Sequence, residues 1–257
     1  MSYIEIQDVS KSYASGEESH TILSHISLSI EKGEFVCLLG PSGCGKTTLM
    51  NLVAGFEKAD AGSITIHGEP VNGPKKDYVT IFQNYGLLPW LTVEKNVMLG
   101  LSDEKLTRKE KQERAEQYLR EVGLYESRGL RPGELSGGMQ QRVAIARALA
   151  VHPEILFMDE PFAALDALTR MRLQDDMLKL SREEKKTILF VTHDIEEAVF
   201  LADRIVILKE NPGEIREIVK VPLGKERDRT WDEFQYLRDH ILRLFEAGVP
   251  DRTEYYI

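Results

Sequence analysis

The feature that most constrains this chain is a glycine-rich stretch, residues 40–48, which reads Gly-Pro-Ser-Gly-Cys-Gly-Lys-Thr-Thr. It follows the G-x-x-x-x-G-K-T spacing of a phosphate-binding loop. The apolar run 35–39 before it predicts a buried strand, and residues 46–54 after it predict a helix that Gly55 ends. Strand, glycine-rich turn and helix in this order predict a nucleotide site in an α/β fold.

Each residue type in this loop suits phosphate binding. Glycines allow successive backbone N–H groups to turn towards one anion, and the N-terminus of the following helix points at the same place. Lys46 is predicted to reach the β- and γ-phosphates, and the Thr47 hydroxyl to ligate Mg²⁺. The alternative is a glycine-rich turn that happens to precede a lysine. The predicted nucleotide-binding residues here are Gly40, Pro41, Ser42, Gly43, Cys44, Gly45, Lys46, Thr47 and Thr48.

Composition narrows the class of protein. The net charge of −9 over 257 residues argues against an extended nucleic-acid surface, so no nucleic-acid partner is expected. The two cysteines, Cys37 and Cys44, have neither metal-binding nor disulfide spacing, which favours a reducing cytoplasm. The N-terminus does not read as a signal peptide. Every apolar run is far shorter than the roughly 20 residues that span a bilayer.

The order of the predicted elements indicates a mainly parallel sheet covered by helices on both faces. Residues 3–35 alternate apolar and polar positions, which predicts a β-rich start that a polar loop interrupts at Tyr13. Further strands are predicted at 62–71, 78–82, 155–158, 187–192 and 204–208. Helices are predicted at 93–124, 139–150, 168–180, 195–202 and 231–247. The last helix carries an apolar stripe, which predicts that it docks on the core.

Two further stretches carry polar residues suited to phosphate chemistry. Asp159 and Glu160 follow an apolar strand, where one carboxylate can hold Mg²⁺ and the next can position or deprotonate a water molecule. The alternative is a pair of surface acids that cap the next helix. Ser136, Gly137 and Gly138 open a helix, which fits either a second anion site or an ordinary N-cap.

Together these stretches resemble the ATP-binding subunit of ABC transporters. Residues 40–47 match the Walker A motif, 135–141 the signature motif, 155–160 Walker B and 163–166 the D-loop, while Gln83 stands at the Q-loop and His193 at the switch position. The resemblance implies a P-loop NTPase core with a mainly parallel sheet, an N-terminal antiparallel β subdomain and an inserted α-helical subdomain. It places the ABC ATPase domain at 1–222, the helical subdomain at about 84–152 and a C-terminal helical extension at 223–257.

The resemblance also implies the role of each site residue, with ATP and Mg²⁺ as ligands. Two copies are expected to pair head-to-tail, so Ser136 with Gly137 and Gly138 would contact the γ-phosphate held by the other copy. Glu160, His193 and Gln83 are the expected catalytic residues, and His193 would orient Glu160. From the residues alone, His193 reads more readily as a core or cap histidine. The remaining assignments are Tyr13 stacking on adenine, Asp166 in the D-loop, and Thr47, Gln83 and Asp159 around Mg²⁺. Ala163 departs from the serine often found in the D-loop, which puts a hydroxyl contact there in doubt.

The stretch after Gln83 resembles that of importers of nitrate, sulfonate, taurine and related oxyanions. Leu87, Leu88, Pro89 and Trp90 are expected to face membrane permease subunits, because exposed apolar residues need a partner to cover them. The alternative is that they pack inside the helical subdomain. The resemblance implies a separate solute-binding protein and a peripheral position on the cytoplasmic face of the membrane. The rival functions are a soluble ABC ATPase acting on DNA or ribosomes, and a nucleotide-sensing module without turnover.

Overall fold

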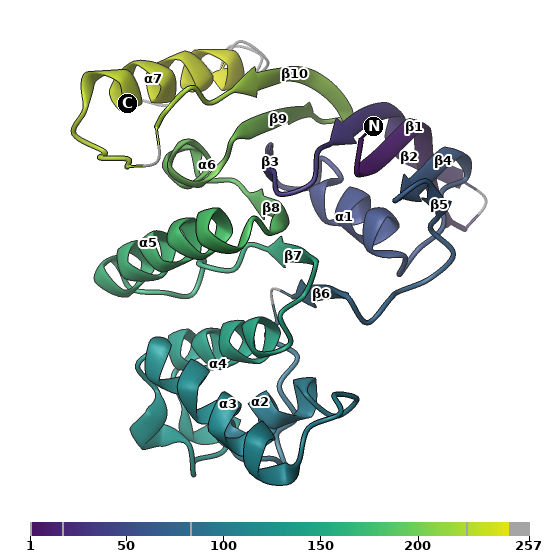
Figure 1. Cartoon of the computed structure of the whole chain (residues 1–257). Helices are drawn as coiled ribbons and strands as arrows, with labels where there is room; N and C mark the ends of the chain where they lie inside the picture. Colours follow the sequence, from purple (N-terminus) through teal and green to yellow (C-terminus); the bar gives the residue numbers. More distant parts are fainter. Residues whose placement is uncertain (1, 17, 83, 225, 247–257) are drawn as a thin grey trace. The chain divides into compact units, whose positions relative to one another are not determined.

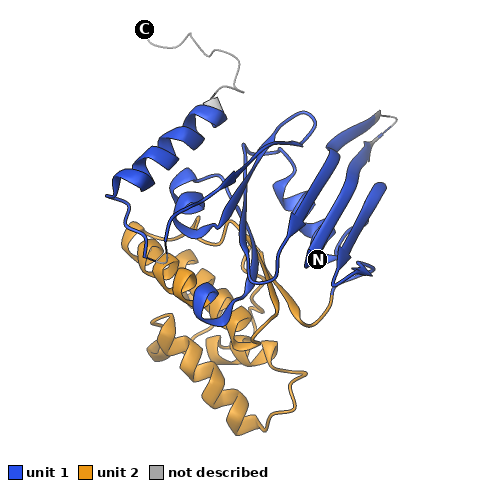
Figure 2. Cartoon of the chain, turned by 45° about the horizontal axis from the view of Figure 1, so that its top comes forward, with its two compact units in different colours: residues 1–74, 181–257 blue, residues 75–180 orange. Residues whose placement is uncertain are grey.

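The computed structural model describes residues 2–16, 18–82, 84–224 and 226–246 (Figure 1). The chain divides into two compact units (Figure 2). Unit 1 comprises residues 1–74 and 181–257, and unit 2 comprises residues 75–180. The chain therefore leaves unit 1 after the phosphate-binding loop, builds unit 2, and returns. The domain boundaries expected from the sequence stay a prediction.

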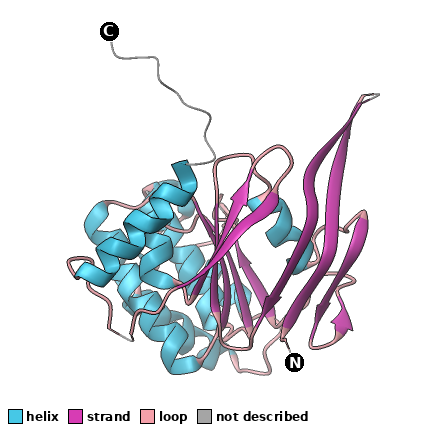
Figure 3. Cartoon of the chain, turned by 90° about the horizontal axis from the view of Figure 1, so that it is seen from above, coloured by secondary structure: helices cyan, strands magenta, loops and turns pink. Residues whose placement is uncertain are grey.

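Unit 1 contains an antiparallel sheet in the strand order β2-β1-β4-β5. All strands are drawn in magenta in Figure 3. Its strands are β1 (Ile4–Ser15), β2 (Glu18–Ile30), β4 (Ala61–Ile66) and β5 (Glu69–Pro70). Ile4 pairs with Ile30 on one side and Ile66 on the other, and all three side chains are buried. The alternating isoleucines of the sequence thus form one apolar face. The prediction that a loop begins at Tyr13 is wrong, because β1 continues to Ser15 and Tyr13 pairs with His20 on β2.

The second sheet of unit 1 carries the phosphate-binding loop. Strand β3 (Phe35–Leu39) lies between β8 (Thr187–Thr192) and β9 (Arg204–Lys209) and runs parallel to both. Every residue of β3 and β8 is buried, as continuous apolar runs predict. Strand β10 (Glu214–Lys220) pairs antiparallel with β9 and is not predicted from the sequence. Its mostly polar, half-exposed residues have no clear apolar alternation.

Three helices complete the described part of unit 1: α1 (Lys46–Ala54), α6 (Ile195–Leu201) and α7 (Asp232–Glu246). Helix α7 packs against α6 and buries Phe234, Leu237 and Ile241, so the predicted docking of this helix is confirmed. Arg227 precedes α7 and donates to the carbonyl oxygens of Val199, Phe200 and Ala202 at 3.1, 2.8 and 2.8 Å. These bonds satisfy carbonyls that the end of α6 leaves without helical partners. Burial lowers the pKa of Arg227 to about 10.

Unit 2 combines two parallel strands, β6 (Tyr78–Ile81) and β7 (Ile155–Asp159), with four helices. The helices are α2 (Val93–Gly100), α3 (Arg108–Glu121), α4 (Gly137–Ala150) and α5 (Ala167–Glu184), and the last residues of α5, from Ser181 on, belong to unit 1. Two short 3₁₀ helices, η1 (Tyr125–Ser127) and η2 (Pro132–Glu134), precede α4. The prediction of a single helix at 93–124 is wrong. This stretch forms two helices, α2 and α3, which have the threonine N-caps Thr92 and Thr107. In the described part of the chain, every helix is too short or too polar to span a bilayer.

Candidate functional site

The phosphate-binding loop follows β3 and requires glycine at two close contacts. Gly45 is the N-cap of α1 with φ of 92°, and a Cβ there would lie 2.5 Å from Cδ2 of Leu23 on β2. A Cβ on Gly40 would lie 2.6 Å from the Cys44 sulfur and 2.9 Å from the Leu208 carbonyl oxygen. Residues of neighbouring strands therefore pack directly against the loop backbone, and only glycine fits at either position.

Lys46 is held inside this loop. Its Nζ donates to the carbonyl oxygens of Gly40 and Pro41 at 2.7 and 2.8 Å, and the side chain is only 6% exposed. The cation is therefore fixed beside the N-terminus of α1, where an anion is favoured. Burial raises the pKa of the Cys44 thiol, and raises that of Cys37 well above its usual value. Both cysteines are buried and free, which fits a packing role and not a reactive thiolate.

Gly213 supports the loop from the β9–β10 turn. Its N–H donates to the Ile22 carbonyl at 2.8 Å, and its carbonyl accepts from the Ser24 N–H at 2.9 Å. A Cβ on Gly213 would lie 2.2 Å from the carbonyl oxygen of Cys44, inside the phosphate-binding loop. This contact is not predicted from the sequence. The turn signal Asn211-Pro212-Gly213 was present, but it does not show which backbone the glycine approaches.

Tyr13 lies beside the phosphate-binding helix. Its hydroxyl donates to a carboxylate oxygen of Glu57 and also interacts with Thr48 near the start of α1. Burial, followed by the bond to Glu57, raises the pKa of Tyr13. The side chain remains 39% exposed. The structure therefore brings together Tyr13 and Thr48, two residues that the sequence analysis assigned to one nucleotide.

His193 stands between β8 and α6 with its side chain exposed, so the core interpretation of this histidine is wrong. The cap of α6 is Asp194, whose carboxylate accepts from the N–H groups of Glu196 and Glu197 at 2.8 and 3.2 Å. The Thr192 hydroxyl donates to the Glu197 carboxylate at 2.8 Å and accepts from the Asp194 N–H at 3.0 Å. These bonds fix the backbone on both sides of His193.

In unit 2, the two carboxylates stand at the end of the fully buried strand β7. Asp159 ends the strand and is 5% exposed. Glu160 has φ of 45°, in the left-handed region that non-glycine residues rarely adopt. Its carbonyl accepts from the Ala163 N–H at 3.2 Å, which closes the turn. Backbone strain of this kind occurs preferentially at functional sites, where the surrounding structure holds it in place.

The signature residues open α4. Ser136 is its N-cap, and its hydroxyl accepts from the Met139 N–H at 3.3 Å, as the capping interpretation predicted. The side chain of Ser136 is nevertheless exposed. A Cβ on Gly137 would lie 3.1 Å from the Tyr85 hydroxyl, and one on Gly138 would lie 3.2 Å from the Ala164 carbonyl. The two glycines thus allow close packing around the start of α4.

Asp166 in the D-loop has a structural role of its own. Its carboxylate accepts from the Thr169 N–H at 3.0 Å in the first turn of α5. This bond, and to a smaller extent the charge of Arg142, holds the pKa of Asp166 below its usual value. The side chain is exposed. It is therefore ionised near neutral pH and accessible to a partner.

The segment that follows Gln83 is held by hydrogen bonds from two side chains of unit 2, Asn96 and Arg147. Asn96 of α2 is fully buried: its Oδ1 accepts from the Leu88 N–H at 2.8 Å, and its Nδ2 donates to the carbonyls of Leu88, Leu91 and Thr92 at 3.1–3.3 Å. Gln83 itself lies outside the described residues. Because one amide holds both ends of residues 88–92, this stretch has a defined conformation.

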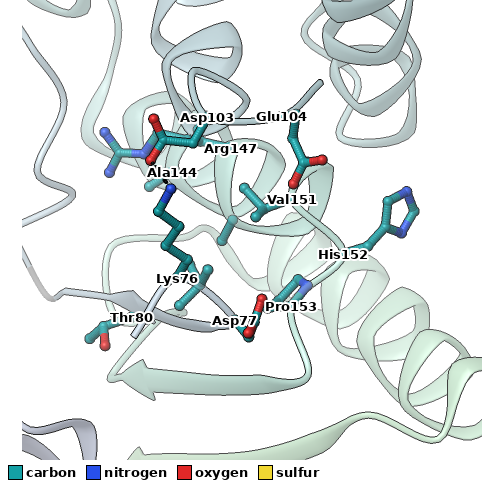
Figure 4. A pocket seen from close by; sticks show the side chains of 13 residues that line it. Lys76, Asp77, Thr80, Asp103, Glu104, Ala144, Arg147, Val151, His152 and Pro153 are labelled. Atoms are coloured by element: carbon teal, nitrogen blue, oxygen red, sulfur yellow. Dashed lines mark ion pairs between the residues drawn. The ribbon is translucent and has the colours of Figure 1, made fainter. Parts of the chain in front are cut away.

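Arg147 of α4 holds the beginning of the same segment. Its guanidinium donates to the carbonyls of Tyr85 and Gly86 at 2.9 and 2.7 Å. Arg147 also lines a cavity of about 290 Å³ in unit 2, where the Lys76 side chain points to Asp103 with a 2.8 Å ion pair (Figure 4). None of the described residues assigned to the nucleotide lines this cavity. Lys76, Asp103 and Arg147, three of its charged side chains, make internal contacts.

Comparisons with known proteins agree with this arrangement of motifs. A profile of the family described as ABC transporter matches residues 23–163. The chain is 44% identical over 230 residues to the bicarbonate transport ATP-binding protein CmpD of Synechocystis sp., a match that covers 88% of this chain and 82% of that protein. The chain belongs to the ABC transporter family. It is an ATP-binding protein of that family and an ATPase, as the sequence resemblance predicted.

Two further similarities extend over most of this ABC ATPase. It is 44% identical over 245 residues to the aliphatic sulfonates import ATP-binding protein SsuB of Bacillus thuringiensis, covering 95% of this chain and 96% of that protein. The solved dimeric ATP-binding cassette MJ0796 bound to ADP and Pi matches with a TM-score of 0.79 and 35% identity, covering 86% of this chain and all of that one. The predicted fold class, an ABC ATPase with parallel and antiparallel sheets and helices, is confirmed.

Proposed function

We propose that this ABC ATPase powers the import of a small oxyanion through separate membrane subunits. The hydrolytic part of the proposal rests on Glu160, which a strained backbone holds directly after the buried strand β7. The import part is supported by the bicarbonate and aliphatic sulfonate proteins to which the chain is similar. Nitrate, sulfonate and taurine, expected from the stretch after Gln83, belong to the same chemical class as these two solutes, except that taurine also carries an amine.

The phosphate-binding loop and Lys46 bind the β- and γ-phosphates of ATP in this proposal. The buried Lys46 ammonium needs little reorganisation, because two loop carbonyls already hold it. Mg²⁺ would be held by Thr47, Asp159 and Gln83. Thr47 is an exposed residue at the start of α1 and Asp159 ends β7, and both side chains carry the oxygen donors that Mg²⁺ prefers. The ion would neutralise charge on the phosphates.

Hydrolysis is assigned to Glu160 as the base that activates water, with His193 contacting the γ-phosphate. Ser136, Gly137, Gly138 and Asp166 would act on the nucleotide held by a second copy. The exposed Ser136 side chain and the small residues beside it support close approach of a partner. The solved cassette described as dimeric and bound to ADP and Pi supports the pairing of two copies.

The partner surface proposed for the membrane subunits is the segment 87–90. Trp90 is 67% exposed and Pro89 is exposed, while Leu87 and Leu88 are partly buried. Asn96 and Arg147 hold this segment in one conformation, which lowers the ordering cost of binding a partner. Docking there would place the chain peripherally on the cytoplasmic face of the membrane.

Trp90→Ala is expected to weaken assembly with the membrane subunits by about tenfold or more, because exposed tryptophans often dominate interfaces. The free energy of unfolding should change by about 0.5 kcal/mol or less, since the side chain is mostly exposed. Trp231→Ala is the matched control, because Trp231 is the other tryptophan and is 43% exposed. Copurification with the membrane subunits measures assembly. A large loss of thermal stability for Trp90→Ala without an assembly defect would show that this residue packs internally.

The proposed function is tested by reconstituting the chain with its membrane subunits and solute-binding protein. Phosphate release is then measured with bicarbonate, nitrate, an alkyl sulfonate or taurine. We expect one of these oxyanions to stimulate hydrolysis and the others to do so weakly. An assembled complex that none of them stimulates would contradict the oxyanion assignment. A chain that binds ATP but releases no phosphate, alone or assembled, would be a sensing module.

A further inference from the structure

Three elements of unit 1 meet at the hydroxyl of Tyr13. Tyr13 lies near the end of β1, Thr48 lies in the first turn of α1, and Glu57 lies two residues after the C-cap of α1, Gly55. The Tyr13 hydroxyl donates to Oε2 of Glu57 and also interacts with Thr48. The phenol is therefore tied to both ends of the helix that follows the phosphate-binding loop.

The backbone after α1 places Glu57 for this contact. Gly55 has φ of 81°, and a Cβ there would lie 2.5 Å from the Gly73 carbonyl carbon, so the chain turns at a position that only glycine fits. The N–H groups of Phe56 and Glu57 then donate to the Asn51 carbonyl at 2.9 and 3.4 Å. The turn thus directs the Glu57 side chain back along α1.

The two carboxylate oxygens of Glu57 have different partners. Oε1 accepts from Nδ2 of Asn51 at 3.2 Å, while Oε2 accepts from the Tyr13 hydroxyl. One partner fixes the carboxylate on α1, and the carboxylate in turn fixes the tyrosine. Hydrogen bonds to an ionised acceptor are stronger than neutral ones, so this bond restricts the tyrosine side chain more than a neutral partner would.

The ring of Tyr13 remains partly exposed while its hydroxyl is bonded to Glu57. The side chain is 39% exposed, and Nζ of Lys11 lies over one face of the ring, 5.4 Å from its centroid, so a stacked base would use the other face. Lys11 is itself paired with Asp60 at 3.0 Å, and Asp60 also accepts from the Ser12 N–H at 2.7 Å. The β1 backbone before the ring is thus fixed as well. An aromatic face held in one orientation can stack on a flat ligand at a lower entropic cost than a free one.

We propose that Glu57 is a positioning residue for the base of the nucleotide: through the Tyr13 hydroxyl it sets the angle of the aromatic face relative to α1, and so to the phosphates. The proposal rests on the stacking of Tyr13 on adenine that the sequence resemblance implies. Glu57 itself touches no part of the nucleotide in this account. Its effect is therefore confined to ligands that carry a base, and it disappears when the hydroxyl is removed.

The test measures the binding of ADP and of inorganic tripolyphosphate to the full chain by calorimetry. Glu57→Leu and Tyr13→Phe should each weaken ADP binding about three- to tenfold, because the ring must then be ordered on binding. The double variant should bind ADP within about twofold of Tyr13→Phe alone, since both changes remove the same bond. Tripolyphosphate, which lacks a base, should bind all of these variants as it binds the parent. Glu57→Gln keeps an acceptor and should restore most of the ADP affinity.

Two controls separate this proposal from other causes. Glu217→Leu removes an exposed carboxylate on β10 and should leave both affinities unchanged. Tyr13→Ala removes the platform itself and should weaken ADP binding more than Tyr13→Phe does. Additive effects of Glu57→Leu and Tyr13→Phe, or equal losses for ADP and tripolyphosphate, would overturn the positioning role and leave Tyr13 stacking intact. Unchanged ADP binding by Tyr13→Ala would instead show that Tyr13 is not the base platform.

Discussion

Glu160→Gln is expected to bind ATP as the parent does and to hydrolyse it about 10²- to 10⁴-fold more slowly, the usual contribution of a positioned general base. The amide has nearly the shape of the carboxylate but cannot accept a proton from water. The backbone at residue 160 should stay in its left-handed conformation, because the turn to Ala163 and the buried strand before it determine that conformation. The ATP-bound dimer should therefore accumulate, since the step that uses up the nucleotide is blocked.

Phosphate release and size-exclusion chromatography with ATP measure the two halves of this expectation. Glu154→Gln is the matched control, because Glu154 is exposed and lies just before the other end of the same strand. It should leave the hydrolysis rate unchanged. A Glu160→Gln protein that turns over ATP at the parent's rate would remove Glu160 from the catalytic role. One that remains monomeric with ATP at high protein concentration would count against the head-to-tail dimer.

The sequence was sufficient to predict the elements that carry the motifs, because those elements depend on local chemistry. A five-residue apolar run followed by a glycine-rich turn has few alternatives to β3, the loop and α1. The same holds for β7 and β8, whose residues are all buried. The N-cap role of Ser136 also follows from its place before α4.

The features that the sequence did not reveal depend on contacts between distant residues. Tyr13 lies in a polar stretch that reads as a loop, but pairing with β2 extends β1 past it. The contact of Gly213 with Cys44 joins two turns that are far apart in the sequence. Glu57 lies outside every motif, and only the turn at Gly55 brings it to Tyr13. None of these contacts leaves a periodic pattern in the residues.

Lys46→Ala should weaken ATP binding about 10- to 100-fold and abolish measurable hydrolysis, because it removes a buried cation that makes charge-assisted bonds. Its homodimer is therefore expected to be inactive. Ser136→Arg should also be inactive as a homodimer, for a different reason. Its own phosphate-binding loop is intact, but the bulk and charge of arginine at the start of α4 would prevent the signature residues from approaching the other copy.

A mixture of these two inactive proteins tests most directly whether each ATP is shared by two copies. In a mixed dimer, one site combines both lesions, while the other joins the intact Lys46 of the Ser136→Arg chain to the intact Ser136 of the Lys46→Ala chain. Phosphate release is measured after subunit exchange, with the membrane subunits present and with the mixed dimer verified by two affinity tags. We expect hydrolysis above that of either parent. A verified mixed dimer that is no more active than its parents would contradict a shared site that works on its own. An active Ser136→Arg homodimer would contradict the assignment of Ser136 to the nucleotide of the other copy.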